Sequence, residues 1–193
     1  AGGIQRFVES HVPFIEEAVI VDTGSLDGTR EILEELESQY PNLRIYDVKF
    51  KGFAHARNYS LKKVKTKYSL VLDADELICH ENPHNGWEPI KEFLEESNDS
   101  CFGIDIMNVH SNGEELWNLS CWNARLFTTE NTKFHRYLYE DHNKITFKFL
   151  IPDTSIKHFL PEKNALKYKK DNFYAGTIPK SFRKNIIKTG KAP

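Results

Sequence analysis

The stretch that decides the fold is Ser69-Leu70-Val71-Leu72-Asp73-Ala74-Asp75-Glu76, an apolar run that turns abruptly into three acids. Residues 68–72 have the length and composition of a strand buried on both faces, as in a parallel sheet, although a buried helical turn has a similar pattern. Ligands of open α/β sheets bind beyond the carboxyl ends of the strands, so we expect Asp73 and Asp75 close to a bound molecule. The alternative is a pair of solvated acids at the end of a strand.

These two aspartates also have the spacing of metal ligands. Separated by one residue and held by a turn, Asp73 and Asp75 can reach a single divalent cation. Hard carboxylate oxygens suit Mg²⁺ or Mn²⁺, so either ion is the expected cofactor of such a site.

Length and composition favour one domain over residues 1–193, because 39% hydrophobic and 12% aromatic residues can bury one substantial core. The formal net charge of -2 gives no general attraction to nucleic acid or to anionic membranes, and neither is an expected partner. No apolar run approaches the roughly 20 residues that span a bilayer. Three scattered cysteines without a CxxC pair indicate a reducing compartment, and the predicted location is cytoplasmic.

The first part of the chain alternates strands with helices, which favours a parallel, doubly wound sheet. Asp27 is the expected N-cap of the second helix. The expected elements, in order, are a helix over the first dozen residues, a strand over 17–21, a helix over 28–39, a strand over 43–48, a helix over 53–64 and a strand over 68–72.

The regular alternation stops after Glu76, and this half of the chain is expected to shape the substrate face. Residues with β-branched and aromatic side chains, separated by turn signals, favour mixed or antiparallel strands here. The expected elements are a helix over 88–96 and strands over 101–109, 116–127, 134–138 and 145–151, followed by a basic helical segment over 161–193.

Two short motifs indicate proteases, and both are rejected. Asp22-Thr23-Gly24-Ser25 matches the string around the catalytic acid of aspartic proteases, but that mechanism needs a second copy, which the chain lacks. Residues 80–84 match the HExxH zinc pattern, in which both histidines lie on one helix face. Pro83 costs about 3 kcal/mol inside such a helix, so a loop is expected instead.

The main constellation combines three motifs in order, namely Val21-Asp22-x-Gly24-Ser25-x-Asp27-Gly28-Thr29, Ala56-Arg57-Asn58 and Asp73-Ala74-Asp75-Glu76. It resembles the family 2 glycosyltransferases, which typically carry a VDDGSxDGT turn, an ARN triplet and a DxD motif on the same structural units. The resemblance covers about residues 4–160. It implies an α/β glycosyltransferase-A fold, with a Rossmann-like, mostly parallel central sheet flanked by helices and mixed strands in the second half.

The resemblance implies different binding functions for the two parts of the chain. Residues 1–76 would bind the nucleotide and diphosphate, and residues 77–160 would bind the acceptor. It also implies metal-dependent transfer of a sugar from a nucleotide-diphosphate sugar, such as a UDP-sugar, to an acceptor hydroxyl, with inversion at the anomeric carbon. The sequence does not identify the acceptor, which could be a glycan, a protein or a lipid.

The resemblance further assigns residues on the donor side. Asp75 would ligate the metal, with Asp73 closer to the ribose or diphosphate, and Asp22 would contact the nucleotide base and ribose. Arg57 would contact phosphate or orient Asp73 through a charge-assisted pair. The alternative for Arg57 is an ordinary salt bridge between a helix and the sheet. For Ser25, Asp27 and Gly28, turn and capping roles are favoured over ligand contacts.

An inverting transfer also needs a base for the acceptor hydroxyl. In the family this is an acid in the second half, and Tyr139-Glu140-Asp141-His142 holds the candidates, with Asp141 favoured and Glu140 second. The alternative is a solvated acidic turn. His158 resembles a late histidine that some members use as another metal ligand, although a lone histidine often has a structural role.

One departure from the family pattern is expected to matter. Family members open with a strand that precedes the first helix, whereas this sequence starts on that helix. Either the sequence is a piece of a longer protein or its donor site is incomplete, and a homodimer could cover the exposed sheet edge. The alternative function is therefore a degenerate, catalytically weak or inactive glycosyltransferase-like domain that binds a partner or a glycan.

Overall fold

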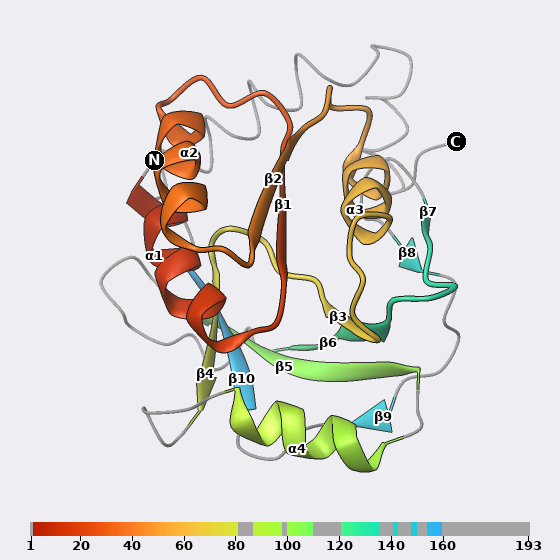
Figure 1. Ribbon diagram of the computed structural model, residues 1–193. Coiled ribbons are helices and arrows are strands. Elements are labelled where there is room, and N and C mark those ends of the chain that lie inside the picture. Colours follow the sequence, from red (N-terminus) through yellow and green to blue (C-terminus); the bar gives the residue numbers. More distant parts are fainter. Residues whose placement is uncertain are drawn as a thin grey trace.

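The computed structural model describes residues 2–80, 87–97, 100–109, 121–135, 141–142, 148–149 and 154–159. The first elements are α1 (Gly2–His11), a 3-10 turn (Val12–Phe14), β1 (Ala18–Asp22), α2 (Thr29–Gln39), β2 (Leu43–Asp47) and α3 (Phe53–Leu61). β1 and β2 are parallel, with Ala18 beside Leu43 and Asp22 beside Asp47. In Figure 1, α1 and α2 lie to one side of these strands and α3 lies to the other. This part confirms the predicted alternation.

A larger mixed sheet follows, in the order β3-β6-β5-β10-β4, with β9 beside β5. β5 runs parallel to β10, whereas the pairs β3–β6, β5–β6 and β10–β4 are antiparallel. Helix α4 lies along this sheet, next to β5 (Figure 1). The elements are β3 (Tyr68–Leu70), β4 (Glu76–His80), α4 (Glu88–Glu96), β5 (Cys101–Val109), β6 (Cys121–Thr128), β9 (Lys148–Phe149) and β10 (Thr154–Phe159), and a separate antiparallel pair is formed by β7 (Phe134–His135) and β8 (Asp141–His142).

The central stretch is a strand, as predicted, but its pairing differs from the prediction. β3 pairs antiparallel with β6, and the ladder continues when the N–H of Val71 donates to the carbonyl of Arg125 at 2.8 Å. The predicted burial on both faces is incomplete, because Ser69 is buried whereas Tyr68 and Leu70 are half-buried, and β3 is the end strand in the described order. A short apolar run does not distinguish a parallel from an antiparallel strand. The acids after β3 also do not lead into a helix, as in an alternating α/β sheet. They form the short connection to β4, which begins at Glu76.

The start of α2 also differs from the prediction. Gly28, with a φ of 84°, occupies the cap position, and glycine has no side chain that could accept a hydrogen bond from the first turn of the helix. Asp27 acts one residue earlier, where its carboxylate accepts the N–H of Thr29 at 3.2 Å. The predicted N-cap at Asp27 was therefore wrong by one position, because the left-handed conformation at residue 28 favours glycine.

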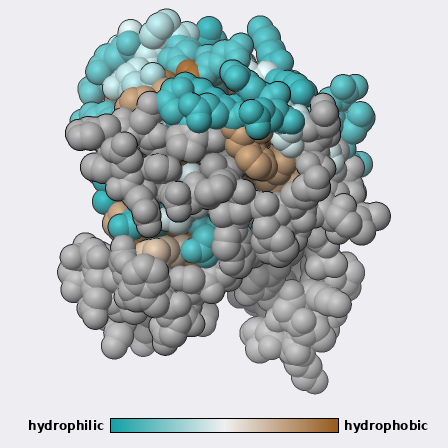
Figure 2. Space-filling view, turned by 90° about the horizontal axis from the view of Figure 1, so that it is seen from below, coloured by the Kyte–Doolittle hydropathy of each residue, from teal (hydrophilic) through white to brown (hydrophobic). Residues whose placement is uncertain are grey.

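Several predictions concern residues outside the described part of the chain. These are residues 116–120, 136–138, 145–147 and 150–151 of the predicted strands, the loop over 81–84 and the helical segment over 161–193. In the described part, no helix has the length and apolar character that a membrane crossing requires. Seen from below, the described surface is largely hydrophilic, with apolar residues visible in small areas (Figure 2).

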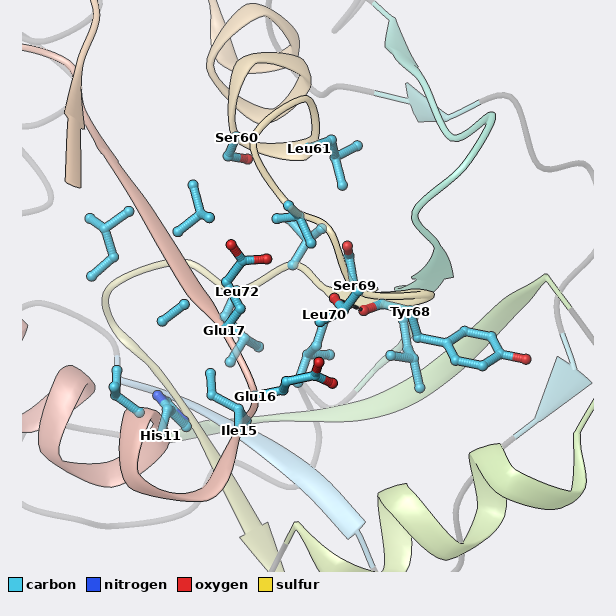
Figure 3. Close-up of a pocket in the computed structure, with 18 of the residues that line it drawn as sticks. His11, Ile15, Glu16, Glu17, Ser60, Leu61, Tyr68, Ser69, Leu70 and Leu72 are labelled. Carbon is cyan, nitrogen blue, oxygen red and sulfur yellow. Dashed lines mark hydrogen bonds between the residues drawn. The ribbon is translucent and has the colours of Figure 1, made fainter. Parts of the chain in front are cut away.

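A cavity of about 770 Å³ separates the two sheets. It is lined by residues of α1, β1, α3, β3 and α4, and the close-up shows Leu70 and Leu72 of the central stretch around it (Figure 3). Among the described strands, β1 pairs with β2 alone and β3 pairs with β6 alone. The two halves of the molecule therefore meet across this cavity.

His11 connects α1 to the mixed sheet. Its side chain is 2% exposed, and its Nε2 accepts the N–H of Ile78 in β4 at 3.2 Å. The rings of Phe7 and Trp87 contact it edge-on, with centroids 4.5 and 5.6 Å away. Burial lowers the pKa of His11 to about 4, an effect that the backbone of Phe7 partly opposes.

This buried histidine predicts a pH-dependent stability. His11 stays neutral in the folded protein, whereas the unfolded chain takes up a proton below about pH 6.5. The stabilisation of the folded state by neutral His11 is therefore complete above that pH and declines on acidification. Between pH 7 and pH 5 we expect it to lower the free energy of unfolding by roughly 2 kcal/mol. Urea unfolding of the wild type and of His11→Gln at both pH values isolates this effect, because only the wild type carries it. Equal pH dependence in the two proteins would contradict the prediction.

Candidate functional site

The three acids of the central stretch form a tight turn between β3 and β4. The N–H of Glu76 donates to the carbonyl of Asp73 at 3.0 Å, and the Glu76 carboxylate accepts the N–H of Asp73 at 2.9 Å. Glu76 is 2% exposed, while the side chains of Asp73 and Asp75 are 49% and 35% exposed. One acid therefore holds the turn from inside, and the other two remain accessible to a ligand.

Two arginines from different elements converge on Asp73. Arg57 of α3 donates from Nη2 to Asp73 Oδ1 at 2.9 Å, and Arg125 of β6 places its Nη2 3.8 Å from Asp73 Oδ2. Arg125 also donates to Glu76 Oε1 at 2.5 Å. Burial raises the pKa of Glu76, and the charge of Arg125 acts in the opposite direction. The predicted charge-assisted pair between Arg57 and Asp73 is thus present.

Asp75 lies next to His158 of β10. The N–H of Phe159 donates to the Asp75 carbonyl at 2.9 Å, and His158 Nε2 is 3.8 Å from Asp75 Oδ2. On its other side, His158 Nδ1 is 2.8 Å from Oδ1 of Asn108, its neighbour in the parallel ladder with β5. The neighbouring Asp75 carboxylate raises the pKa of His158, while burial opposes the rise. A donor Nδ1–H toward Asn108 leaves Nε2 facing Asp75.

The arrangement fits a divalent cation held by two protein ligands. Asp75 and His158 face each other, and a cation between a carboxylate oxygen and an imidazole nitrogen is chemically suitable. Asp73 is directed to the arginines instead. No cluster of three or more His, Cys, Asp or Glu side chains suited to a metal ion occurs among the described residues. Mg²⁺ commonly uses one or two carboxylates and completes its shell with water and substrate phosphates, so two ligands suffice for a substrate-assisted site.

Asp22 lies at the end of β1 in a polar turn. Its carboxylate accepts the Ser25 N–H at 3.2 Å and the Ser25 hydroxyl at 2.6 Å, and Gly24 has a φ of 110°. Asp22 is the register neighbour of Asp47, which pairs with both Nε and Nη2 of Arg30 at 2.8 and 3.1 Å. Ser25 therefore shapes the turn, as predicted.

The candidate base lies on a pair of strands attached to α3. The Asn58 side chain donates to the Phe134 carbonyl at 2.8 Å and accepts the Phe134 N–H at 2.8 Å. The ring of Phe134 also lies 5.6 Å from Arg57 Cζ. β7 pairs with β8 so that His135 lies opposite Asp141, which brings the backbone of Asp141 to the side of the molecule that carries Arg57. Glu140 lies outside the described residues.

Four contributors were not assigned a role from sequence. The sequence identifies Glu76 only as the third acid of the run, and Asn58 only as the last residue of the Ala56-Arg57-Asn58 triplet. Arg125 and Asn108 have no role assigned from sequence. Glu76 could have been found from its place at the start of a β-strand that buries it, because a buried carboxylate requires a partner of opposite charge.

The doubly bonded amide of Asn58 predicts a measurable loss of stability. Asn58→Leu keeps the side-chain size but leaves the N–H and carbonyl of Phe134 without their partners. We expect Asn58→Leu to lower the free energy of unfolding, measured with urea, by about 2 kcal/mol. Ser60→Ala on the same helix is the matched control, because its hydroxyl bonds only to the Arg57 carbonyl of its own helix and should cost under about 0.5 kcal/mol. Equal costs for the two variants would refute the role of Asn58.

Comparison with known proteins identifies relatives of this arrangement. The family model described as Glycosyl transferase family 2 matches residues 4–159. The teichoic acid poly(glycerol phosphate) polymerase of Staphylococcus epidermidis is 40% identical over 63 residues, which are 32% of this chain and 9% of that protein. The chondroitin synthase of Pasteurella multocida is 30% identical over 125 residues, which are 63% of this chain and 13% of that protein. The chain thus spans a small part of these relatives.

A solved structure with a similar fold is S. aureus TarS in complex with UDP-GlcNAc. It superposes with a TM-score of 0.57 at 18% identity, over 82% of this chain and 55% of that chain. The TarS complex with UDP superposes with a TM-score of 0.51 at 18% identity, over 85% and 58% of the two chains. The predicted glycosyltransferase-A fold, with parallel strands first and a mixed sheet after them, is confirmed by this likeness.

Proposed function

The chain belongs to glycosyl transferase family 2, and from this membership we propose that it transfers a sugar from a nucleotide-diphosphate sugar to an acceptor hydroxyl, with inversion at the anomeric carbon. The observation that carries the proposal is the turn at residues 73–76, where two accessible aspartates lie beside His158 and two arginines. TarS, which shares the fold, has been solved with UDP-GlcNAc and with UDP. A UDP-sugar is therefore the first donor to test.

On the donor side, each accessible group has a distinct proposed task. Asp22, at the carboxyl end of β1, accepts hydrogen bonds from the ribose or base, since ligands of such sheets bind beyond the strand ends. Asp73 fixes the Arg57 guanidinium at 2.9 Å, and that guanidinium then has a defined orientation toward the diphosphate. Because Asp73 is already paired, we propose that it acts near the diphosphate rather than as the main metal ligand.

Asp75 and His158 are the proposed protein ligands of Mn²⁺ or Mg²⁺. When bound, the cation would act as a Lewis acid for the diphosphate leaving group. His158 is oriented for this task by Asn108, whose Oδ1 lies 2.8 Å from Nδ1. Such a hydrogen bond to the second ring nitrogen is the usual way in which a ligating histidine is held in one orientation.

Asp141 is the proposed base that deprotonates the acceptor hydroxyl, with Glu140 as the second candidate. The support is positional, because the backbone of Asp141 pairs with β7, and β7 is bonded to the helix that carries Arg57. The acceptor is a hydroxyl of a glycan, a protein or a lipid. A cytoplasmic location and homodimerisation both stay predictions from the sequence.

A second function, binding without turnover, is favoured by one observation. Arg57 already pairs with an acid of the protein itself, so an incoming diphosphate must compete for its guanidinium. Calorimetry with UDP-sugars, with and without Mn²⁺, separates the two functions when combined with a measurement of UDP release. Binding without release supports the degenerate domain, and no heat at millimolar donor excludes the transferase.

The metal assignment predicts a large loss of turnover in Asp75→Ala. Removing the carboxylate beside His158 leaves the cation with one proposed protein ligand. We expect UDP release from the active donor to fall by about 100-fold or more. Glu35→Gln, an exposed acid on α2, is the matched control and should keep wild-type turnover. Unchanged turnover in Asp75→Ala would contradict the metal assignment.

The base assignment predicts different outcomes for two neighbouring acids. Asp141→Asn should lower kcat by about 100-fold or more while the donor KM changes little, because a general base acts on the acceptor. Glu140→Gln should retain most of the activity. The steady-state kinetics of donor and acceptor for both variants provide the measurement, and the opposite ranking would transfer the role of base to Glu140.

A further inference from the structure

We propose that Glu76 and Arg125 are positioning residues, and that the ion pair between them fixes the turn that carries Asp73 and Asp75. The expected effect on donor binding rests on the proposed function, but the effect on the geometry of the turn does not. Neither residue is expected to touch the donor, since Glu76 is 2% exposed and Arg125 is engaged by Glu76 through its Nη2.

Both oxygens of the Glu76 carboxylate are engaged. Oε2 accepts the N–H of Asp73 at 2.9 Å, and Oε1 accepts Nη2 of Arg125 at 2.5 Å. The N–H of Glu76 closes the same turn by donating to the Asp73 carbonyl at 3.0 Å. Asp73 is thus held through its main-chain N–H and its carbonyl by a single residue, and that residue is anchored by Arg125.

Arg125 extends this hold from the main chain of Asp73 to its side chain. Its own carbonyl accepts the N–H of Val71 at 2.8 Å, which ties β6 to the chain just before the turn. Its Nη2 is also 3.8 Å from Asp73 Oδ2, while Arg57 bonds to the other carboxylate oxygen at 2.9 Å. The Asp73 carboxylate lies between two guanidinium groups, one from each side of the turn.

Asp75 depends on the same pair because it lies between the two clamped residues. Its carbonyl accepts the N–H of Phe159, and its side chain faces His158, which lies opposite Glu76 in the β4–β10 ladder. When the Glu76 carboxylate is removed, the turn that carries Asp75 loses the hydrogen bond to the Asp73 N–H. The separation of 3.8 Å between Asp75 and His158 should then no longer be maintained.

A purely structural role would not require charges at these two positions. Well-packed apolar side chains of similar size are often as stable as a buried ion pair, or more stable, whereas removal of one partner is strongly destabilising. An apolar pair therefore preserves packing but removes the hydrogen bond to the Asp73 N–H. The double variant Glu76→Met with Arg125→Met separates stability from positioning.

The test compares Glu76→Gln, Arg125→Met, Arg125→Lys and the double methionine variant with the wild type and with Glu35→Gln. The geometry of the turn is followed in the protein alone by the ring nitrogen chemical shifts of His158 at fixed pH. Affinity is followed by calorimetry with UDP and Mn²⁺. Urea unfolding of every variant shows that the measurements are made on folded protein.

We expect the double variant to fold, to shift the His158 ring nitrogen signals and to bind UDP with Mn²⁺ about tenfold more weakly, as is typical when a group behind a metal ligand is removed. Arg125→Lys should recover part of the affinity, and Glu35→Gln should match the wild type. A folded double variant with wild-type His158 signals would overturn the inference. If the wild type itself binds no UDP with Mn²⁺, the proposed function fails, and the His158 signals still decide whether the pair positions the turn.

Discussion

The contact between the buried Glu76 carboxylate and the Arg125 guanidinium links the two kinds of structure in this protein. A carboxylate at 2% exposure is expensive to bury without a charged partner, and Arg125 supplies that partner from β6, the antiparallel neighbour of β3. Because Glu76 also opens β4, the pair connects β6, the acidic turn and β4 in one hydrogen-bonded unit. This buried contact therefore fixes the turn that carries the accessible acids.

The two sheets explain why the turn lies where it does. β1 and β2 form a parallel pair, whereas β3 belongs to the mixed sheet, and the cavity of about 770 Å³ lies between β1 and β3. α3 bridges this separation: it packs beside β1, pairs through Arg57 with Asp73 and holds β7 through Asn58. The donor-side turn, the proposed metal ligands and the strand before the proposed base are thus connected through one helix and one ion pair.

Most elements of the first half could be predicted, because helical and strand periodicities there are long and the turns between them are marked by Gly, Pro and Asp. The accessible Asp73 and Asp75 were found for the same reason, since an acid after an apolar strand is a local signal. The pairing of β3 was not predictable, because a short apolar run has the same pattern in a parallel and in an antiparallel strand. The contact of Glu76 with Arg125 joins residues 49 positions apart, and no local pattern encodes a separation of that kind.

The charges at the site also explain why Asp73 and Asp75 differ despite their shared motif. Asp73 is neutralised by Arg57 and approached by Arg125, so its negative charge is already compensated before any ligand arrives. Asp75 has His158 as its neighbour, and an imidazole, unlike a guanidinium, can give up its proton and its contact when a cation binds. In the proposed function, a divalent cation would therefore meet less competition at Asp75, whereas an anionic diphosphate would be drawn to Arg57 beside Asp73. The two aspartates, separated by a single alanine, would in this way be directed to opposite charges of the proposed ligand complex.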